Sequence, residues 1–287
     1  MSQDAAPLPA LSLELAELAV SDLARSAGFY ERAVGLRRLR ETADMVELGG
    51  EGGRPILRLT ESRDARPKPA DAAGLFHVAF LLPDRAALAT AFARLANAGL
   101  LTGASDHLVS EAIYLDDPDG LGIEIYRDRP KSEWPYADGR LKMATEPIDQ
   151  RGLVAELARD AALDAPAPAA TTVGHLHFQV GDLDEARAFW VDAVGLELMT
   201  TYPGALFMSA GGYHHHVAAN VWRSRGRKPA PEDCARLASF EVTIPAGTLA
   251  TTATRLDAAG VAFERRSETL LAREPSGAIA VMREPAR

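Results

Sequence analysis

The apolar and polar positions of this chain repeat one pattern four times. Each repeat opens with an alternating or largely apolar stretch, which predicts a strand. The four stretches are Leu18–Val20, Val78–Leu82, Leu176–Val180 and Phe240–Ile244. A turn containing Asp or Pro follows each of them. The next segment carries apolar residues at i, i+3 and i+4 spacing, such as Leu88, Phe92 and Leu95, and predicts a helix of about 12–15 residues.

Each predicted helix ends at a glycine, the residue that most readily takes the left-handed conformation after a helix. The four glycines are Gly35, Gly99, Gly195 and Gly260. Turn-forming pairs such as Gly49-Gly50 and Asp119-Gly120 then separate further short strands. The predicted order is strand, helix and three strands, in units at about 11–62, 74–128, 172–224 and 236–284, which indicates the α+β class.

The two halves of the chain are duplicates. The segment 20–36 matches 180–196 with 8 of 17 residues identical, and 87–100 matches 248–261 with 7 of 14 identical. Between the halves lie a polar stretch at 127–143, a predicted helix at Gln150–Leu163 capped by Asp149, and an Ala/Pro-rich linker at 164–172. We therefore expect a tail at 1–10, an N-terminal domain at 11–130, a connection at 131–171 and a C-terminal domain at 172–287.

Composition narrows the function classes. The 287 residues carry a formal net charge of −9, which argues against binding to nucleic acid or to an anionic membrane, since both need a basic face. One cysteine, Cys234, cannot form an internal disulfide, so we expect a reducing, cytoplasmic location. The first residues lack the basic region of a signal peptide, and no apolar run approaches the roughly 20 residues of a membrane span.

All seven histidines fall between residues 77 and 216. Alignment of the duplicated units shows that three polar residues are each present in one copy and absent from the other. Ser239 matches His77, Leu15 matches His175, and Ala280 matches Glu124 after a one-residue gap. The middle of the chain therefore carries chemistry that its duplicates lack.

Glu124 lies in an otherwise apolar strand, between Ile123 and Ile125. Alternation places its side chain on the face opposite both isoleucines, and a buried carboxylate needs a partner. A lone histidine at a strand start is commonly a surface or hydrogen-bonded residue. Two imidazoles and one carboxylate on a single sheet, however, form the triad of non-haem Fe(II) oxygenases, which leaves coordination positions open.

Several motifs resemble the vicinal-oxygen-chelate superfamily, which includes glyoxalases, bleomycin-resistance proteins and extradiol dioxygenases. They are the Gly-His opening at 174–175, followed by Val-Gly-Asp-Leu at 180–183, and Pro-Asp-Gly at 118–120 before Gly-Ile-Glu-Ile-Tyr at 122–126. The strings SDHLVSEA at 105–112 and GGYHHH at 211–216 are similar to the two-domain catechol 2,3-dioxygenases found in bacilli. The resemblance extends over almost the whole chain from about residue 11.

The resemblance implies four βαβββ modules that pair into two cup-shaped mixed sheets, incomplete barrels with helices outside. It also implies a metal inside a cup. Many extradiol enzymes take their ligands from units three and four, where this chain has Ser239 and Ala280. A complete set of His77, Glu124 and His175 requires unit two to face unit three, so we predict that pairing, with units one and four forming a second cup without metal.

The resemblance further implies three catalytic residues. Tyr114 is similar to the family's tyrosine that hydrogen-bonds a substrate oxygen, and His107 to a second histidine of the pocket. His215, in a strand expected at Tyr213–His216, is similar to the acid/base histidine. Alternation puts His214 and His216 on one face of that strand and His215 on the other, so not all three can reach the metal, and His214 and His216 stay open as alternatives. His177 shares a strand face with His175 and is either a pocket residue or a surface residue.

These features predict an extradiol dioxygenase that cleaves a catechol or a substituted catechol with O2 at a non-haem Fe(II), with Mn(II) accepting the same ligands. The partners are then a small aromatic diol and O2, with no nucleic acid and no membrane, and the family implies a homo-oligomer. Two alternatives remain. One is another metalloenzyme of this fold, such as a glyoxalase-like isomerase, an epimerase or a hydroquinone dioxygenase. The other is a non-enzymatic binding or resistance protein.

Overall fold

Each of the four units folds as one strand, one helix and three further strands. The computed structural model describes residues 11–285, so the predicted tail at 1–10 lies outside the described residues. Unit one contains β1 (Ser12–Val20), α1 (Leu23–Ala33), β2 (Arg37–Glu41), β3 (Met45–Gly49) and β4 (Leu57–Glu61). Unit two contains β5 (Gly74–Leu81), α2 (Arg85–Asn97), β6 (Gly103–Asp106), β7 (Ser110–Asp116) and β8 (Gly122–Asp128).

The C-terminal units repeat this order. Unit three contains β12 (Thr172–Gln179), α4 (Leu183–Arg187), β13 (Glu197–Tyr202), β14 (Ala205–Ser209) and β15 (Val217–Asn220), and its helix continues as a π-helix over Ala188–Val194. Unit four contains β16 (Arg236–Thr243), α5 (Leu249–Ala258), β17 (Phe263–Arg266), β18 (Thr269–Arg273) and β19 (Ile279–Arg283). Asp22, Asp84 and Asp182 cap α1, α2 and α4 by accepting backbone N–H groups, as the turn pattern predicts.

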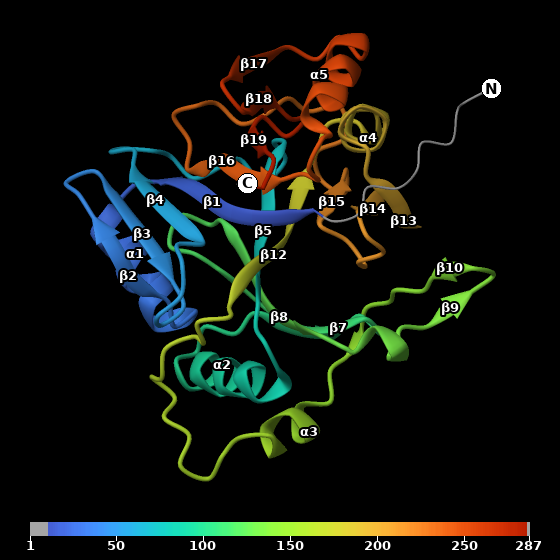
Figure 1. Cartoon of the computed structure of the whole chain (residues 1–287). Coiled ribbons are helices and arrows are strands. Elements are labelled where there is room, and N and C mark those ends of the chain that lie inside the picture. Colours follow the sequence, from blue (N-terminus) through green and yellow to red (C-terminus); the bar gives the residue numbers. More distant parts are fainter. Residues whose placement is uncertain (1–10, 286–287) are drawn as a thin grey trace.

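The units pair across the sequence halves, and this confirms the predicted pairing. One sheet of nine strands has the order β11-β6-β7-β8-β5-β12-β15-β14-β13 and joins unit two to unit three. The other, of eight strands, has the order β17-β18-β19-β16-β1-β4-β3-β2 and joins unit four to unit one. The seams are antiparallel, β5 against β12 and β1 against β16 (Figure 1). That 11–130 and 172–287 form separate folding domains stays a prediction.

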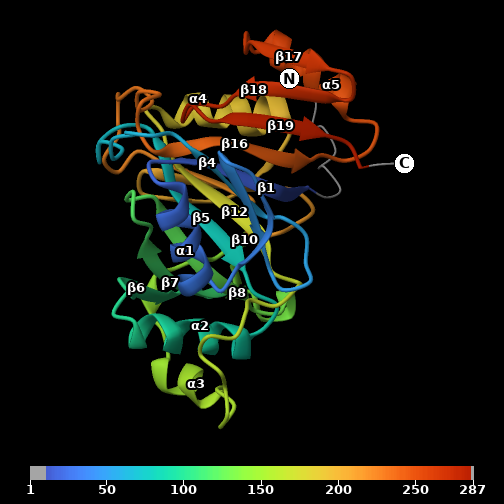
Figure 2. The same ribbon diagram turned by 90° about the vertical axis from the view of Figure 1, so that its left-hand side faces the viewer.

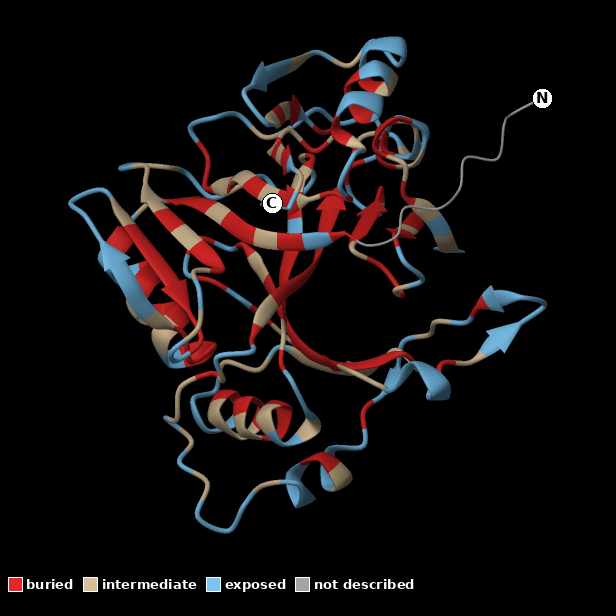
Figure 3. Ribbon diagram, in the orientation of Figure 1, coloured by how far each residue is buried: buried red, intermediate tan, exposed pale blue. Residues whose placement is uncertain are grey.

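Helices cover the outside of the curled sheets, as predicted for this α+β fold. In Figure 1, α1 lies beside the β2–β4 strands, α2 lies below β8, and α4 and α5 lie near the strands of the C-terminal units; Figure 2 shows the same layers from the side. The buried residues follow the strands and the inner faces of the helices (Figure 3). Ile123, Ile125 and Phe80 belong to this apolar core together with Leu88 and Phe92 of α2. The outward face of the nine-stranded sheet is therefore fixed by apolar packing, and its other face is free for polar side chains.

The connection between the halves contains less helix than predicted. Asp149 caps α3 (Gln150–Ala155) by accepting the Gly152 N–H, but the helix ends at Ala155 rather than at Leu163. Leu153 is its one buried residue, and a short helix without an apolar stripe gains too little from packing to continue. Before α3 come a 3-10 turn at Lys131–Glu133 and the short strands β9 (Tyr136–Ala137), β10 (Arg140–Leu141) and β11 (Glu146–Pro147). Within residues 11–285, no helix has the length and apolar character needed to cross a membrane.

Candidate metal centre

The strand register brings the three predicted metal ligands together. Glu124 on β8 lies opposite Ala79 on β5, and Ala79 lies opposite His175 on β12. Residues paired in this way point to the same face of a sheet, and the small Ala79 side chain leaves space between the two polar ones. His77 lies two residues before Ala79 and so joins the same face. Three side chains from three neighbouring strands therefore project into one concavity.

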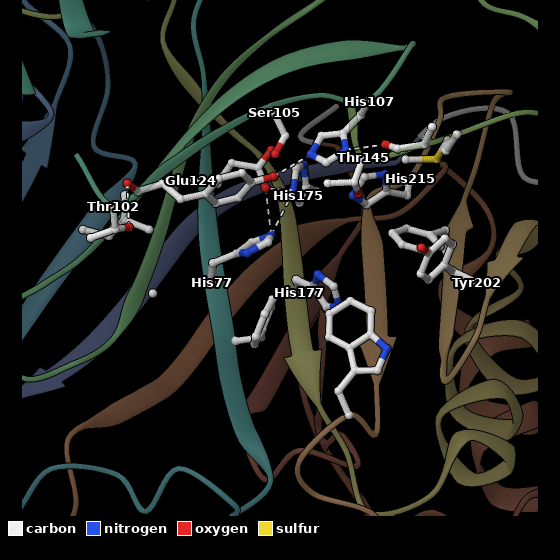
Figure 4. A pocket seen from close by; sticks show the side chains of 18 of the residues that line it. His77, Thr102, Ser105, His107, Glu124, Thr145, His175, His177, Tyr202 and His215 are labelled. Atoms are coloured by element: carbon white, nitrogen blue, oxygen red, sulfur yellow. Dashed lines mark hydrogen bonds and ion pairs between the residues drawn. The ribbon is translucent and has the colours of Figure 1, made fainter. Parts of the chain in front are cut away.

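The three ligand atoms converge. His77 Nε2 lies 2.9 Å and His175 Nε2 lies 3.1 Å from the same oxygen, Glu124 Oε2, and the two nitrogens are 3.3 Å apart. Figure 4 shows these three side chains pointing toward one another. All three residues are buried. Within the described chain the buried His175 Nδ1 has no hydrogen-bond partner, so the polar contacts of this ring are all at the Nε2 end. Two imidazoles and a carboxylate suit a divalent first-row metal ion.

The electrostatics of the centre favour the forms of these residues that bind metal. Burial lowers the pKa of His175 to about 4, against the opposing charge of Glu124. Burial would raise the pKa of Glu124, but the adjacent imidazoles of His175 and His77 hold that pKa well below its ordinary value. At neutral pH the His175 ring is therefore neutral and the carboxylate is ionised, as metal coordination requires.

The eight-stranded sheet has no metal ligands at the positions equivalent to His77, Glu124 and His175. Its strand pairing also corrects the predicted match of Glu124 with Ala280. In the pairing of β1 with β16, Leu15 lies opposite Glu241, just as His175 lies opposite Ala79. In the pairing of β16 with β19, Glu241 lies opposite Val281, just as Ala79 lies opposite Glu124.

The residue equivalent to Glu124 is thus Val281, and the predicted match to Ala280 is wrong by one position. The turns Asp117-Pro-Asp-Gly120 and Glu274-Pro-Ser-Gly277 have the same length, so no gap is needed to align the strands that follow them. Ala280 faces the apolar core.

Tyr114 and His107 form a pair beside the centre. Tyr114 on β7 lies directly opposite Glu124 on β8. His107 Nδ1 lies 2.7 Å from the Ala144 carbonyl oxygen, so this nitrogen carries the proton and Nε2 accepts a hydrogen bond from the Tyr114 hydroxyl at 2.6 Å. Burial raises the pKa of Tyr114 well above its ordinary value, and the charge of Glu124 adds to the effect. Tyr114 therefore stays a neutral hydrogen-bonding group.

The predicted strand at Tyr213–His216 is wrong, because β15 begins at Val217 and the residues before it form a bend. Gly211 and Gly212 both have positive φ, of 65° and 66°, so the chain turns sharply and the strand pairing starts late.

The three consecutive histidines occupy three environments. His215 lies at the cavity, and its ring centroid is 4.2 Å from that of His175. His216 Nδ1 lies 2.8 Å from Ser209 Oγ, at the other side of the bend. His214 is fully buried and lies 2.8 Å from Asp128. Of the three open candidates, His215 is therefore the one that reaches the cavity.

A chain of hydrogen bonds sets the tautomer of His215. The Asp128 carboxylate accepts from His214 Nε2–H at 2.8 Å, which leaves Nδ1 as the acceptor nitrogen of the His214 ring. That nitrogen lies 2.7 Å from His215 Nδ1, which must then carry a proton and donate it. Burial, with the neighbouring His175, lowers the pKa of His215 well below its ordinary value. Neutral His215 therefore keeps its lone pair on Nε2.

Two further polar residues stay outside the ligand set. His177 is buried at the cavity rather than exposed, and its Nε2 accepts from Asn220 Nδ2 at 3.0 Å. Glu17 lies on β1 in the other sheet, where its carboxylate accepts from Ser239 Oγ at 2.7 Å, so it cannot serve as a fourth ligand.

The glycine before His175 is required by close packing. A Cβ on Gly174 would overlap the hydroxyl of Tyr126, whose ring centroid lies 4.8 Å from that of His175. We expect Gly174→Ala to lower the free energy of unfolding by about 1–3 kcal/mol in chemical denaturation, because Tyr126 must move.

Gly28→Ala in α1 is the matched control. A Cβ there meets the mobile end of Arg32, and we expect little change or a small gain in stability. Combining Gly174→Ala with Tyr126→Phe should recover part of the loss, and fully additive effects of the two changes would contradict the packing explanation.

A cavity of about 470 Å³ opens beside the ligands. All six predicted site residues line it: His77, His107, Tyr114, Glu124, His175 and His215. The sequence did not reveal Asp128 or Asn220, which orient histidines of this site. Asp128 could have been found, since it lies four residues after Glu124 in the same strand and alternation puts both on one face.

Known proteins resemble this chain in sequence. Residues 12–125 and 172–270 match the Glyoxalase/Bleomycin resistance protein/Dioxygenase superfamily. The chain is 40% identical over 269 residues to catechol-2,3-dioxygenase of Bacillus subtilis (strain 168), covering 92% of this chain and 94% of that protein.

Solved structures share the fold. A candidate dioxygenase from Bacillus subtilis subsp. subtilis str. 168 superimposes with a TM-score of 0.64 at 14% identity, covering 98% of this chain and 87% of that chain. Glyoxalase I from Zea mays superimposes with a TM-score of 0.56 at 16% identity, covering 96% and 92%. At these identities the superpositions concern the fold alone.

Proposed function

The chain belongs to the glyoxalase/bleomycin resistance protein/dioxygenase superfamily and is a catechol 2,3-dioxygenase-like enzyme, and we propose that it cleaves a catechol ring beside the two hydroxyls, using O2. The observation that carries the proposal is the convergence of two imidazoles and one carboxylate on a buried point of a cavity that also holds Tyr114, His107 and His215. We place the protein in the cytoplasm as a homo-oligomer.

His77, Glu124 and His175 would hold the metal, Fe(II) in this proposal, with Mn(II) as the alternative that accepts the same ligands. When bound, the metal supplies a Lewis acid that lowers the pKa of the diol hydroxyls and holds the diol near O2. The carboxylate of Glu124 neutralises part of the charge of the ion. The buried surroundings exclude water from the reacting groups.

The remaining residues act on the diol. His215, with its lone pair on Nε2, accepts a hydroxyl proton from the catechol as general base and can return a proton later as general acid. The Tyr114 hydroxyl, held by His107 Nε2 at 2.6 Å, orients a substrate oxygen. Asp128 and His214 act through His215 by fixing its tautomer.

The direct test is anaerobic reconstitution of the metal-free protein with Fe(II), and separately with Mn(II), followed by a panel of catechols. We expect O2 uptake that matches the diol consumed, and a yellow ring-fission product, with one of the two metals. A protein that binds the metal but consumes O2 with none of the catechols would overturn the proposal. That result would favour an isomerase of this superfamily, to be tested with isomerase substrates.

A further inference from the structure

The cavity beside the metal centre is larger than the reacting ring. Its volume of about 470 Å³ lies within the range of roughly 300–1,000 Å³ that holds drug-sized ligands. Unsubstituted catechol is much smaller than such ligands. A substrate that fills the cavity therefore carries a substituent on the ring.

One wall of the cavity is aromatic and open to solvent. The ring centroid of Phe76 lies 4.8 Å from that of His177 and 5.5 Å from that of Trp222. Trp222 is 46% exposed, yet its indole N–H donates to the Pro203 carbonyl oxygen at 2.8 Å, which fixes the ring. Three of the seven large hydrophobic side chains exposed within residues 11–285, Phe76, Tyr202 and Trp222, line this one cavity. Such a concentration of exposed apolar surface marks a binding site for an apolar group.

The charge of the lining sets the second condition. No lysine or arginine belongs to the lining formed by the described residues, and its charged groups are the carboxylates of Glu124 and Asp116. The other polar groups along the walls include neutral hydroxyls, such as that of Thr200. Glu124 is a ligand of the proposed metal, which leaves Asp116 as the other charged carboxylate of the lining. A carboxylate on the substituent would lose water against these walls without meeting a lysine or arginine, and it would be repelled by Asp116.

From these three observations, and resting on the proposed function, we infer that the substrate is a catechol whose substituent is apolar and uncharged. The diol lies at His77, Glu124 and His175, and the substituent lies against the aromatic wall. Catechols that bear a carboxylate are poor substrates.

The test compares two diols that differ in charge but share an electron-withdrawing carbonyl on the ring: methyl 3,4-dihydroxybenzoate and 3,4-dihydroxybenzoate. We expect kcat/KM for the ester to exceed that for the acid by at least about 100-fold. Anaerobic calorimetry of both compounds with the Fe(II)-loaded protein supplies a readout that does not depend on turnover, and we expect the same order of affinities.

Two variants probe the walls. Thr200 lines the cavity and lies opposite Phe207 in the pairing of β13 with β14, so Thr200→Arg introduces a cation into the lining. We expect this variant to lower the ratio of kcat/KM for the ester to kcat/KM for the acid by at least about tenfold. Thr251→Arg adds the same charge at an exposed position of α5, outside the cavity lining, and should leave the ester-to-acid ratio of kcat/KM unchanged. Trp222→Ala should lower the preference for 4-tert-butylcatechol over catechol by about tenfold.

The outcomes separate the two levels of the proposal. The inference is supported if kcat/KM is higher for the ester than for the acid, and if Thr200→Arg reduces this difference while Thr251→Arg does not. Equal binding and cleavage of acid and ester overturns the inference but leaves the proposed function standing. If no catechol is bound or cleaved, the proposed function fails and the inference falls with it.

Discussion

The Glu124→Gln variant is expected to bind Fe(II) at least about 100-fold more weakly than the wild type and to cleave no catechol, because even residues that only support a ligand cost 10–100-fold in affinity. Glu124 Oε2 is the atom on which both His77 and His175 converge. An amide oxygen in its place carries no negative charge to balance a divalent cation. Metal content after dialysis and O2 uptake measure the two losses, and His77→Ala should reproduce them.

A matched control residue lies in the eight-stranded sheet. Glu47 is also a buried glutamate on a strand, and its carboxylate pairs with Arg58 at 2.7 Å. We expect Glu47→Gln to keep the metal affinity and the activity of the wild type. Circular dichroism of each metal-free variant separates loss of the ligand from loss of the fold. A Glu124→Gln protein that is loaded and active would refute the ligand assignment.

The second large effect concerns proton transfer. We expect His215→Asn to lower kcat by about 10²–10⁴-fold, the usual contribution of a general acid–base residue, while the protein still binds Fe(II) with affinity near that of the wild type. The next residue supplies the control, since His216 faces Ser209 rather than the cavity. We expect His216→Asn to retain kcat within a few-fold. If kcat fell equally in the two variants, the loss would come from disruption of the bend at 213–216 and not from removal of the general base.

The hydrogen-bond chain behind His215 gives a finer version of this experiment. Nitrogen-15 spectra of histidine in the metal-free protein report which ring nitrogen carries the proton. We expect His215 to be protonated at Nδ1, and Asp128→Ala to release that tautomer, since His214 then loses its acceptor. kcat should fall by about tenfold while the metal stays bound. A wild-type His215 protonated at Nε2 would contradict the proposed role of Asp128.

The architecture of this protein could be predicted largely from repetition in its sequence. Strand alternation and helical spacing gave the four units, and the incomplete set of ligands in each half predicted that unit two pairs with unit three. The pairing followed from chemistry, because His77 and Glu124 lacked a second imidazole within their own half. Alternation at Ile123–Ile125 correctly placed the two isoleucines in the core and Glu124 on the other face.

The errors fall where the backbone departs from regular structure. The strand expected at Tyr213–His216 is a bend, because two glycines with positive φ precede it. The match of Ala280 with Glu124 is wrong by one residue, because the two turns that precede these strands have equal length and need no gap. Alternation turns such a slip into a change of face, from the cavity to the core.

Other features have no local signal in the sequence. The Asp128–His214 contact joins residues 86 apart, and the aromatic wall combines Phe76 with Trp222. Their proximity depends on the curvature of the sheet and on the pairing of β5, β12 and β15. Such contacts require the assembled fold.

The pairing of units across the sequence has a consequence for synthesis on the ribosome. The nine-stranded sheet draws on residues up to Asn220, so all three metal ligands can meet before unit four has been made. β1 pairs with β4 within unit one, but its other edge waits for β16, more than 200 residues later. Among the described strands, β1 thus waits longest for its second neighbour. Because an exposed strand edge invites association with other chains, the emerging protein is most vulnerable to aggregation at β1.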